Sequence, residues 1–62
     1  MLNPGTVLSL RSAPEIGLWT VVSCARSDDD ETDVVLLGRV TLLHVSSSRE
    51  SFDDRWDVVH EP

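Results

Sequence analysis

The densest group of chemically capable side chains is the acidic run from Asp28 to Asp33, with the sequence DDDETD. Closely spaced carboxylates suggest calcium, but an EF-hand loop also needs a glycine at its sixth position and a glutamate at its twelfth. Counted from Asp28, these positions hold Asp33 and Arg39. We therefore expect no specific metal site and interpret the run as a solvated loop. The alternative is that Asp28, Asp29 and Asp30 bind a protein partner.

Nucleophiles and soft metal ligands are few and scattered. Cys24 is the single cysteine, and His44 and His60 are the only histidines, without the short ligand spacing of a structural zinc site. No Gly-x-Ser-x-Gly elbow accompanies the serines. So short a chain also leaves little room for a pocket with an oxyanion hole. We expect no enzymatic activity, no catalytic residue and no cofactor.

Two tryptophans, Trp19 and Trp56, are better suited to recognition than to catalysis. An indole offers a large apolar surface with one N–H donor, which is typical of residues that anchor protein interfaces. In a domain this small we expect one indole in the core and the other on an exposed groove. Both are therefore candidate partner-binding residues.

The charge balance excludes several kinds of partner. The chain has five arginines, no lysine and 11 acidic residues, with a formal net charge of −6. Such a surface repels the nucleic-acid backbone and anionic lipid. No apolar run approaches the ~20 residues that span a bilayer, and the start of the chain lacks a signal-peptide pattern. We expect no direct nucleic-acid or membrane binding and a cytoplasmic location, with the virion as the alternative.

The length predicts a single domain over residues 1–62. A chain of this size buries only about 60% of the surface that its unfolded form exposes. Small domains compensate with disulfides, a metal or self-association. One cysteine cannot form an internal disulfide. Self-association is thus the compensation that the sequence leaves open.

The elements that would position these residues are strands. Thr6–Arg11 alternates apolar and polar side chains, which predicts a half-buried strand. Leu18–Arg26 is rich in branched and aromatic residues, which predicts a second strand. Ser27–Asp33 is expected to be the hairpin loop that follows, because aspartates favour turns and charges beside apolar strands suppress aggregation.

The apolar run Val34–Val45 is predicted to form one long strand, because its valines disfavour a helix. Gly38 lies inside it and suggests a bulge or bend that reverses which side chains face the core. We expect Val35 and Leu37 to face the core before the bend, and Val40, Leu42 and His44 after it. This strand is the expected interface, and Val40 and Leu42 are candidate partner-binding residues.

The last part of the chain is expected to hold a loop, Ser46–Ser51, and a final strand, Phe52–His60, with a short turn at its start. Phe52, Trp56 and Val58 would then share one face. Four or five bent strands in one short chain predict an all-β protein, either a small barrel or a strongly bent antiparallel sheet.

Two segments carry a resemblance to a known family. "PGTVLSLRS", Pro4 to Ser12, followed by "LWTVVS", Leu18 to Ser23, resembles the opening of small bacterial and phage SH3-like proteins. The Gly-Gly-Pro that is usual there is replaced by Ala13-Pro14-Glu15. The resemblance covers about a third of the chain and implies a small SH3-like barrel. Many members have no known activity, so it assigns no functional residue.

Three hypotheses of function follow. The first is a non-enzymatic protein-interaction module, encoded by a phage or a GC-rich prokaryote, that binds a protein partner or a second copy through a strand edge or an apolar groove. The second is an acidic inhibitor that imitates nucleic acid and occupies the basic cleft of a host enzyme. The third is a small structural component of a virion.

Overall fold

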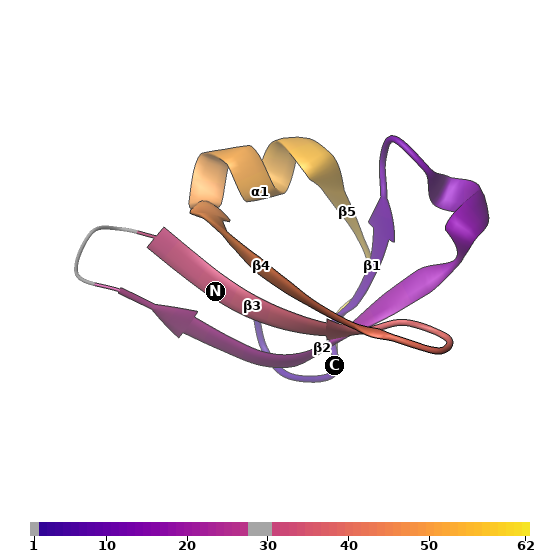
Figure 1. Cartoon of the computed structure of the whole chain (residues 1–62), viewed down its shortest axis with the longest axis horizontal. Helices are drawn as coiled ribbons and strands as arrows, with labels where there is room; N and C mark the ends of the chain where they lie inside the picture. Colours follow the sequence, from indigo (N-terminus) through magenta and orange to yellow (C-terminus); the bar gives the residue numbers. More distant parts are fainter. Residues whose placement is uncertain (1, 28–30) are drawn as a thin grey trace.

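The computed structural model describes residues 2–27 and 31–62 (Figure 1). A short 3-10 helix, η1, spans Pro14–Ile16, and one α-helix, α1, spans Arg49–Arg55. The strands are β1 (Val7–Leu10), β2 (Leu18–Arg26), β3 (Glu31–Leu37), β4 (Leu42–Ser48) and β5 (Trp56–His60).

All five strands belong to one antiparallel sheet with the order β4-β3-β2-β1-β5. Strand β2 lies at the centre and has a register shift between Val21 and Ser23, where the ladder is locally irregular. In the described residues β4 and β5 do not pair, so they form the two edges of an open sheet. Helix α1 connects these edges (Figure 1). The prediction of an all-β, strongly bent antiparallel sheet is confirmed.

Alternation along the strands builds the core. Leu8 of β1 is 0% exposed, and Trp19 and Val21 of β2 are buried beside it. The rings of Trp19 and Trp56 meet in a T-shaped arrangement with the centroids 6.0 Å apart, and Trp56 stacks on Phe52 at 5.9 Å. Among the described residues, the buried apolar set is Leu2, Leu8, Trp19, Val21, Val34, Leu36, Phe52 and Trp56.

The prediction of one long strand over Val34–Val45 is wrong, because this segment is the hairpin of β3 and β4. The chain reverses at Gly38, whose N–H donates a hydrogen bond to the carbonyl of Thr41 over 2.8 Å. The Trp19 ring lies directly against Gly38, so that a Cβ there would be 2.7 Å from its Cζ3 atom. Glycine is therefore the residue that lets the turn pass beside the indole.

The hairpin also reverses the expected facing of the side chains. Val34 and Leu36 are buried, whereas Leu37 is 48% exposed. In β4 the half-buried residues Leu43 and Val45 pack against the core. The expectation that Val40, Leu42 and His44 face the core is wrong, because the chain turns back instead of bulging and these residues are all exposed.

Two expected loops are shorter than predicted. Thr32 is buried inside β3, so Glu31 to Asp33 belong to the strand and not to the acidic loop. Ser46 to Ser48 likewise complete β4. Residues 28–30, which include the predicted aspartates, lie outside the described residues.

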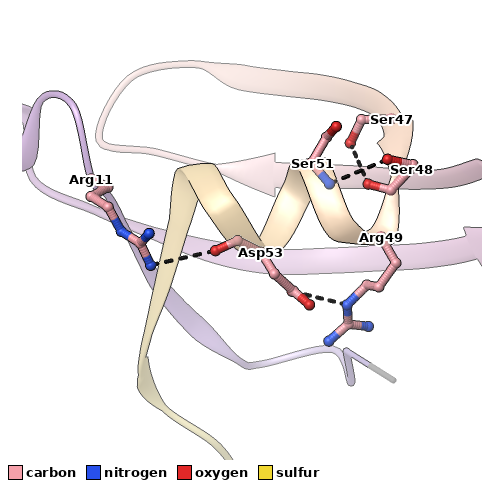
Figure 2. Close-up of polar contacts among 6 residues, drawn as sticks. All are labelled: Arg11, Ser47, Ser48, Arg49, Ser51 and Asp53. Atoms are coloured by element: carbon pink, nitrogen blue, oxygen red, sulfur yellow. Dashed lines mark hydrogen bonds and ion pairs between the residues drawn. The ribbon is translucent and has the colours of Figure 1, made fainter.

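Helix α1 replaces the predicted loop and the start of the last strand. Ser48 caps it, because its hydroxyl accepts a hydrogen bond from the N–H of Ser51 at 3.2 Å (Figure 2). Arg49 pairs with Asp53 across one turn at 3.0 Å. The inward-facing residue of the helix is Phe52, which is 2% exposed. The helix therefore closes the core between the two edge strands.

Candidate functional site

The free edge of β4 is the most unusual surface of the described chain. Among the described residues, β4 pairs only with β3, over an unshifted register from Leu42↔Leu37 to Ser48↔Glu31. Its seven residues, LLHVSSS, include no Asp, Glu, Lys, Arg, Pro or Gly. Natural proteins usually protect edge strands with such residues, with bulges or by keeping the strand short. Strand β4 has none of these protections.

The hairpin turn indicates which backbone groups of this edge are free. The hydrogen bond from Gly38 to Thr41 makes that pair a hydrogen-bonded one, and in an antiparallel ladder such pairs alternate with non-bonded pairs. Leu43, Val45 and Ser47 therefore direct their N–H and carbonyl groups toward β3. The residues between them direct the same groups away from β3, and these are Leu42, His44, Ser46 and Ser48. The carbonyls of Leu42 and Ser48 accept hydrogen bonds from the Thr41 and Ser47 hydroxyls, so His44 and Ser46 present the open backbone groups of this edge in the described part of the chain.

The core is incompletely covered beneath this edge. Leu36 and Val34 of β3 are 0% and 1% exposed. Their direct partners in β4, Leu43 and Val45, face the same side of the sheet but are only half-buried. No residue of β4 is fully buried. A further strand added at this edge would cover apolar surface as well as backbone groups.

An exposed apolar cluster lies at the hairpin end of the same strands. Its central residue is Val40, which is 96% exposed at the tip of the turn. Leu37 and Leu42 form a cross-strand pair on the outer face, and Thr20 pairs with Leu37 from β2. We define the hairpin patch as Ile16, Leu18, Leu37, Val40 and Leu42, each of which is about half exposed or more.

A shallow cleft of about 240 Å³ runs into the hairpin patch, and its lining includes Trp19, Arg39 and Val40. Arg39 is the only charged residue between Val34 and Ser48 when histidine is neutral. The cleft is thus an apolar hollow with one cation at its rim, too small for a drug-sized ligand.

A larger cleft of about 700 Å³ lies between the start of α1 and the far ends of β2 and β3. Arg26, Arg49, Glu50 and Asp53 line it, together with the half-buried thiol of Cys24. Arg49 is already paired with Asp53. The mixed charges and the absence of a convergent polar set give this cleft no clear ligand chemistry.

The predicted candidates are only partly brought together. Trp19 and Trp56 are 7% and 5% exposed, so the expectation of one indole on an exposed groove is wrong. Both are needed to fill a core that has one other aromatic residue, Phe52. The rim of Trp19 still reaches the small cleft beside Val40, and its buried Nε1 has no hydrogen-bond partner among the described atoms. Leu42 lies in the hairpin patch, and Asp28, Asp29 and Asp30 lie outside the described residues.

Several carboxylates of the described chain are held in local contacts. Arg11 donates hydrogen bonds to Asp57 Oδ1 at 2.6 and 3.1 Å, and these bonds hold the pKa of that carboxyl below its usual range. The same guanidinium reaches the backbone carbonyl of Asp53 at 3.4 Å, which fastens β1 to α1 (Figure 2). On the outer face of the hairpin, the Ser46 hydroxyl donates to Asp33.

Among residues 2–27 and 31–62, no three His, Cys, Asp or Glu side chains gather closely enough to hold a metal ion. In that part of the chain, no helix has the length and apolar character needed to cross a membrane.

Sequence reasoning missed β4 as an edge strand. The signal was present as an uncharged stretch, Leu42 to Ser48, that follows Gly38 at hairpin distance. Comparison with protein-family models, with curated proteins and with solved structures finds no match for this chain.

Proposed function

We propose that this protein is a non-enzymatic interaction module that binds protein through the free edge of β4, with the hairpin patch as a second contact. The observation that carries the proposal is the edge itself: seven regular residues without a charge, a proline or a glycine. The resemblance of Pro4–Ser12 and Leu18–Ser23 to small SH3-like proteins supports a small β module, which is built here on an open sheet.

Strand addition explains how such an edge would recognise a partner. The outward N–H and carbonyl groups of β4 supply hydrogen bonds that any extended segment can complete. Specificity comes from side chains, which alternate between the two faces of the sheet. On the core face they meet the half-buried Leu43 and Val45, and on the other face they meet Leu42 followed by His44 and Ser46. The preferred partner is an extended segment with apolar side chains on the core face and one more beside Leu42.

The acidic-mimic hypothesis has less support. Among the exposed carboxylates of the described chain, Asp53 and Asp57 are each paired with an arginine, which reduces the free negative charge that a basic cleft would meet. The virion hypothesis is compatible with strand addition and differs from it only in the identity of the partner.

Affinity capture with matched variants tests the proposal. The tagged protein, a His44→Pro variant and a variant with Asp28, Asp29 and Asp30 replaced by serine are incubated with extract from the source organism. Proline at position 44 removes one outward N–H of the edge and leaves the β3 ladder intact. We expect partners to be lost with His44→Pro and retained with the serine variant, and to survive high salt. Partners that are lost with the serine variant, or as salt rises, would support the mimic instead.

A further inference from the structure

We propose that the partner of the β4 edge is a second copy of this chain, paired antiparallel about a two-fold axis that passes through Val45. This inference rests on the proposed function, because it names the occupant of the same edge. The result is a continuous sheet across two protomers, in which each copy contributes five strands.

The backbone of β4 is complementary to itself in this register. With Val45 on the axis, the outward-facing Leu42 lies opposite Ser48 of the second copy, and His44 lies opposite Ser46. His44 and Ser46 direct their N–H and carbonyl groups at each other, as a hydrogen-bonded antiparallel pair requires. The carbonyls of Leu42 and Ser48 already accept hydrogen bonds from the Thr41 and Ser47 hydroxyls, and Ser48 also caps α1, so the two His44–Ser46 pairs about the axis carry the backbone contact.

The side chains are complementary too. On the core side, Val45 meets Val45 of the second copy, and Leu43 lies opposite Ser47 and diagonal to Val45. These are the half-buried residues at the thinly covered margin of the core. Closely opposed apolar pairs stabilise a sheet, and pairing covers the same margin in both copies at once. The same surface of both copies forms the contact, as an isologous interface requires.

Charge favours the antiparallel arrangement over a parallel one. One end of the β3–β4 hairpin carries Arg39 as its only charge. The other end has Glu31 at the start of β3 and Glu50 just after β4, against Arg26 at the end of β2, while Arg49 is paired with Asp53, so its described charges sum to a net negative value. Antiparallel pairing sets each Arg39 end beside the acidic end of the second copy. Parallel pairing would bring the acidic ends of two chains, each of net charge −6, together.

The interface is expected to be modest in area. A standard stable interface removes about 800 Å² per partner, roughly a fifth of the 4279 Å² that this chain exposes. A single edge strand supplies less than that, so we expect self-association with a dissociation constant of roughly micromolar order. Concentration-dependent sizing is therefore the appropriate measurement.

Sedimentation of the whole chain over a concentration series gives the first test. We expect monomer and dimer in exchange for the natural sequence and for His44→Ala, which keeps the backbone N–H. His44→Pro removes that N–H from both copies, so the dimer should weaken about tenfold or more. Circular dichroism and thermal unfolding check that His44→Pro keeps the fold. A second variant, His44→Lys with Ser46→Lys, tests the same edge with an intact backbone, because like charges would then lie directly opposite each other.

A crosslink tests the register. In a Cys24→Ala background, Val45→Cys places two thiols on the axis, where a non-hydrogen-bonded pair has Cα atoms about 4.5 Å apart and a disulfide forms. Leu43→Cys is the matched control on the same face, since its two thiols would be about 13 Å apart along the strands. We expect mild oxidation to give a dimer with Val45→Cys and not with Leu43→Cys.

The failures are distinguishable. A natural chain that stays monomeric at every concentration would overturn the homodimer. The proposed function would still stand if capture remained sensitive to His44→Pro. A dimer unaffected by both edge variants, or one crosslinked by Leu43→Cys and not by Val45→Cys, would place the interface elsewhere and also overturn the inference. If His44→Pro captured the same partners as the natural chain, the proposed function itself would be overturned.

Discussion

Strand β5, at one margin of the sheet, has five residues and carries the charged Asp57, whereas β4, at the other margin, has seven residues and no charge. The β1–β5 register shifts between Val7 and Leu8, whereas the β3–β4 register is unbroken. Glu61 and Pro62 directly follow β5. Short length, charge, irregularity and proline are the features that discourage edge pairing.

The contrast shows that the two edges of the sheet differ in how readily they can pair with another strand. Apolar residues are exposed near both margins, since Val58 and Val59 of β5 are 50% and 55% exposed. Exposure alone therefore does not distinguish the two edges. What distinguishes them is whether the backbone beside the apolar residues is regular and free of charge, and that condition holds at β4.

The largest effect is expected at Trp56, which holds β5 to the core. Trp56→Ala removes the stack on Phe52 and the edge contact with Trp19, and should lower the free energy of unfolding by about 3–5 kcal/mol. Such a loss approaches the whole stability of a small domain. Urea unfolding measures it, with the exposed Val58→Ala as control, for which about 0.5 kcal/mol is expected. Equal losses for the two variants would show that the aromatic core is wrongly assigned.

The next effect concerns the turn that places β4. Gly38→Ala would set a methyl group 2.7 Å from the Trp19 ring, and the repacking should destabilise the fold by about 1–3 kcal/mol. Thr41→Ala, at the other end of the same turn, is the control and should change little. A double variant with Trp19→Phe should lose less than the sum of its single changes, because the ring that clashes becomes smaller. Strict additivity would contradict the contact.

The junction of β4 with α1 gives a smaller effect. Ser48→Ala removes the cap on the N–H of Ser51 and should destabilise the protein by about 1 kcal/mol. Ser48→Asp keeps a capping oxygen and should recover most of the loss. Thermal unfolding measures both variants. If alanine and aspartate behaved alike, Ser48 would not be acting as a cap.

The smallest effect concerns the charge on the β5 side. Hydrogen bonds from Arg11 lower the pKa of Asp57 in the folded state, so their stabilisation is present above the ordinary aspartate pKa of about 3.9. It is lost as the pH falls below that value and the carboxyl is protonated. The unfolding midpoint of Asp57→Asn should thus lie slightly below that of the natural chain at neutral pH and converge with it in acid.

Asp54→Asn is the matched control for this pH series, because it removes an equal charge near Arg11 without breaking those hydrogen bonds. A midpoint difference between Asp57→Asn and the natural chain that persisted unchanged into acid would assign the effect to packing instead of the ion pair.

Much of the fold could be predicted from side-chain types alone. The bounds of β2, Leu18–Arg26, agree with the prediction, because a loop marked by Pro14 and Gly17 precedes the strand and the polar run from Ser27 follows it. The inward facing of Thr6 and Leu8 also follows from alternation, and both are buried. These are local signals, which a single strand carries in its own sequence.

The position of β4 could not be predicted in the same way. A glycine inside an apolar run is typical of a bulge as well as of a turn, and Gly38-Arg39-Val40-Thr41 lacks the Asn-Gly or Asp-Gly pair that marks a tight hairpin. The deciding contact is between Gly38 and Trp19, which lie far apart in the chain. Because that contact sets the facing of every later residue, the candidate site at Leu42 was predicted on the wrong side of the sheet.

Helix α1 was not predicted, because the spacing of Phe52 and Trp56 fits a strand as well as a helix. Residues four apart share a face in a strand and also in a helix. The misfit was Asp54, which would face the core in a strand and points to solvent in the helix. Ser48 followed by Glu50 was the available sign of a helix start.

The pairing of β1 with β5 has a consequence for the order of folding. Strands β2, β3 and β4 pair with their neighbours in sequence, whereas Val7 must find His60. Because closing a long loop loses more chain entropy than closing a short one, the three-stranded meander should form early and β5 should dock late. Until it docks, the outer side of β1 is bare, so a nascent chain has an unprotected margin on each side of the sheet. A chaperone or a low protein concentration would therefore do most to prevent aggregation in the interval before β5 docks.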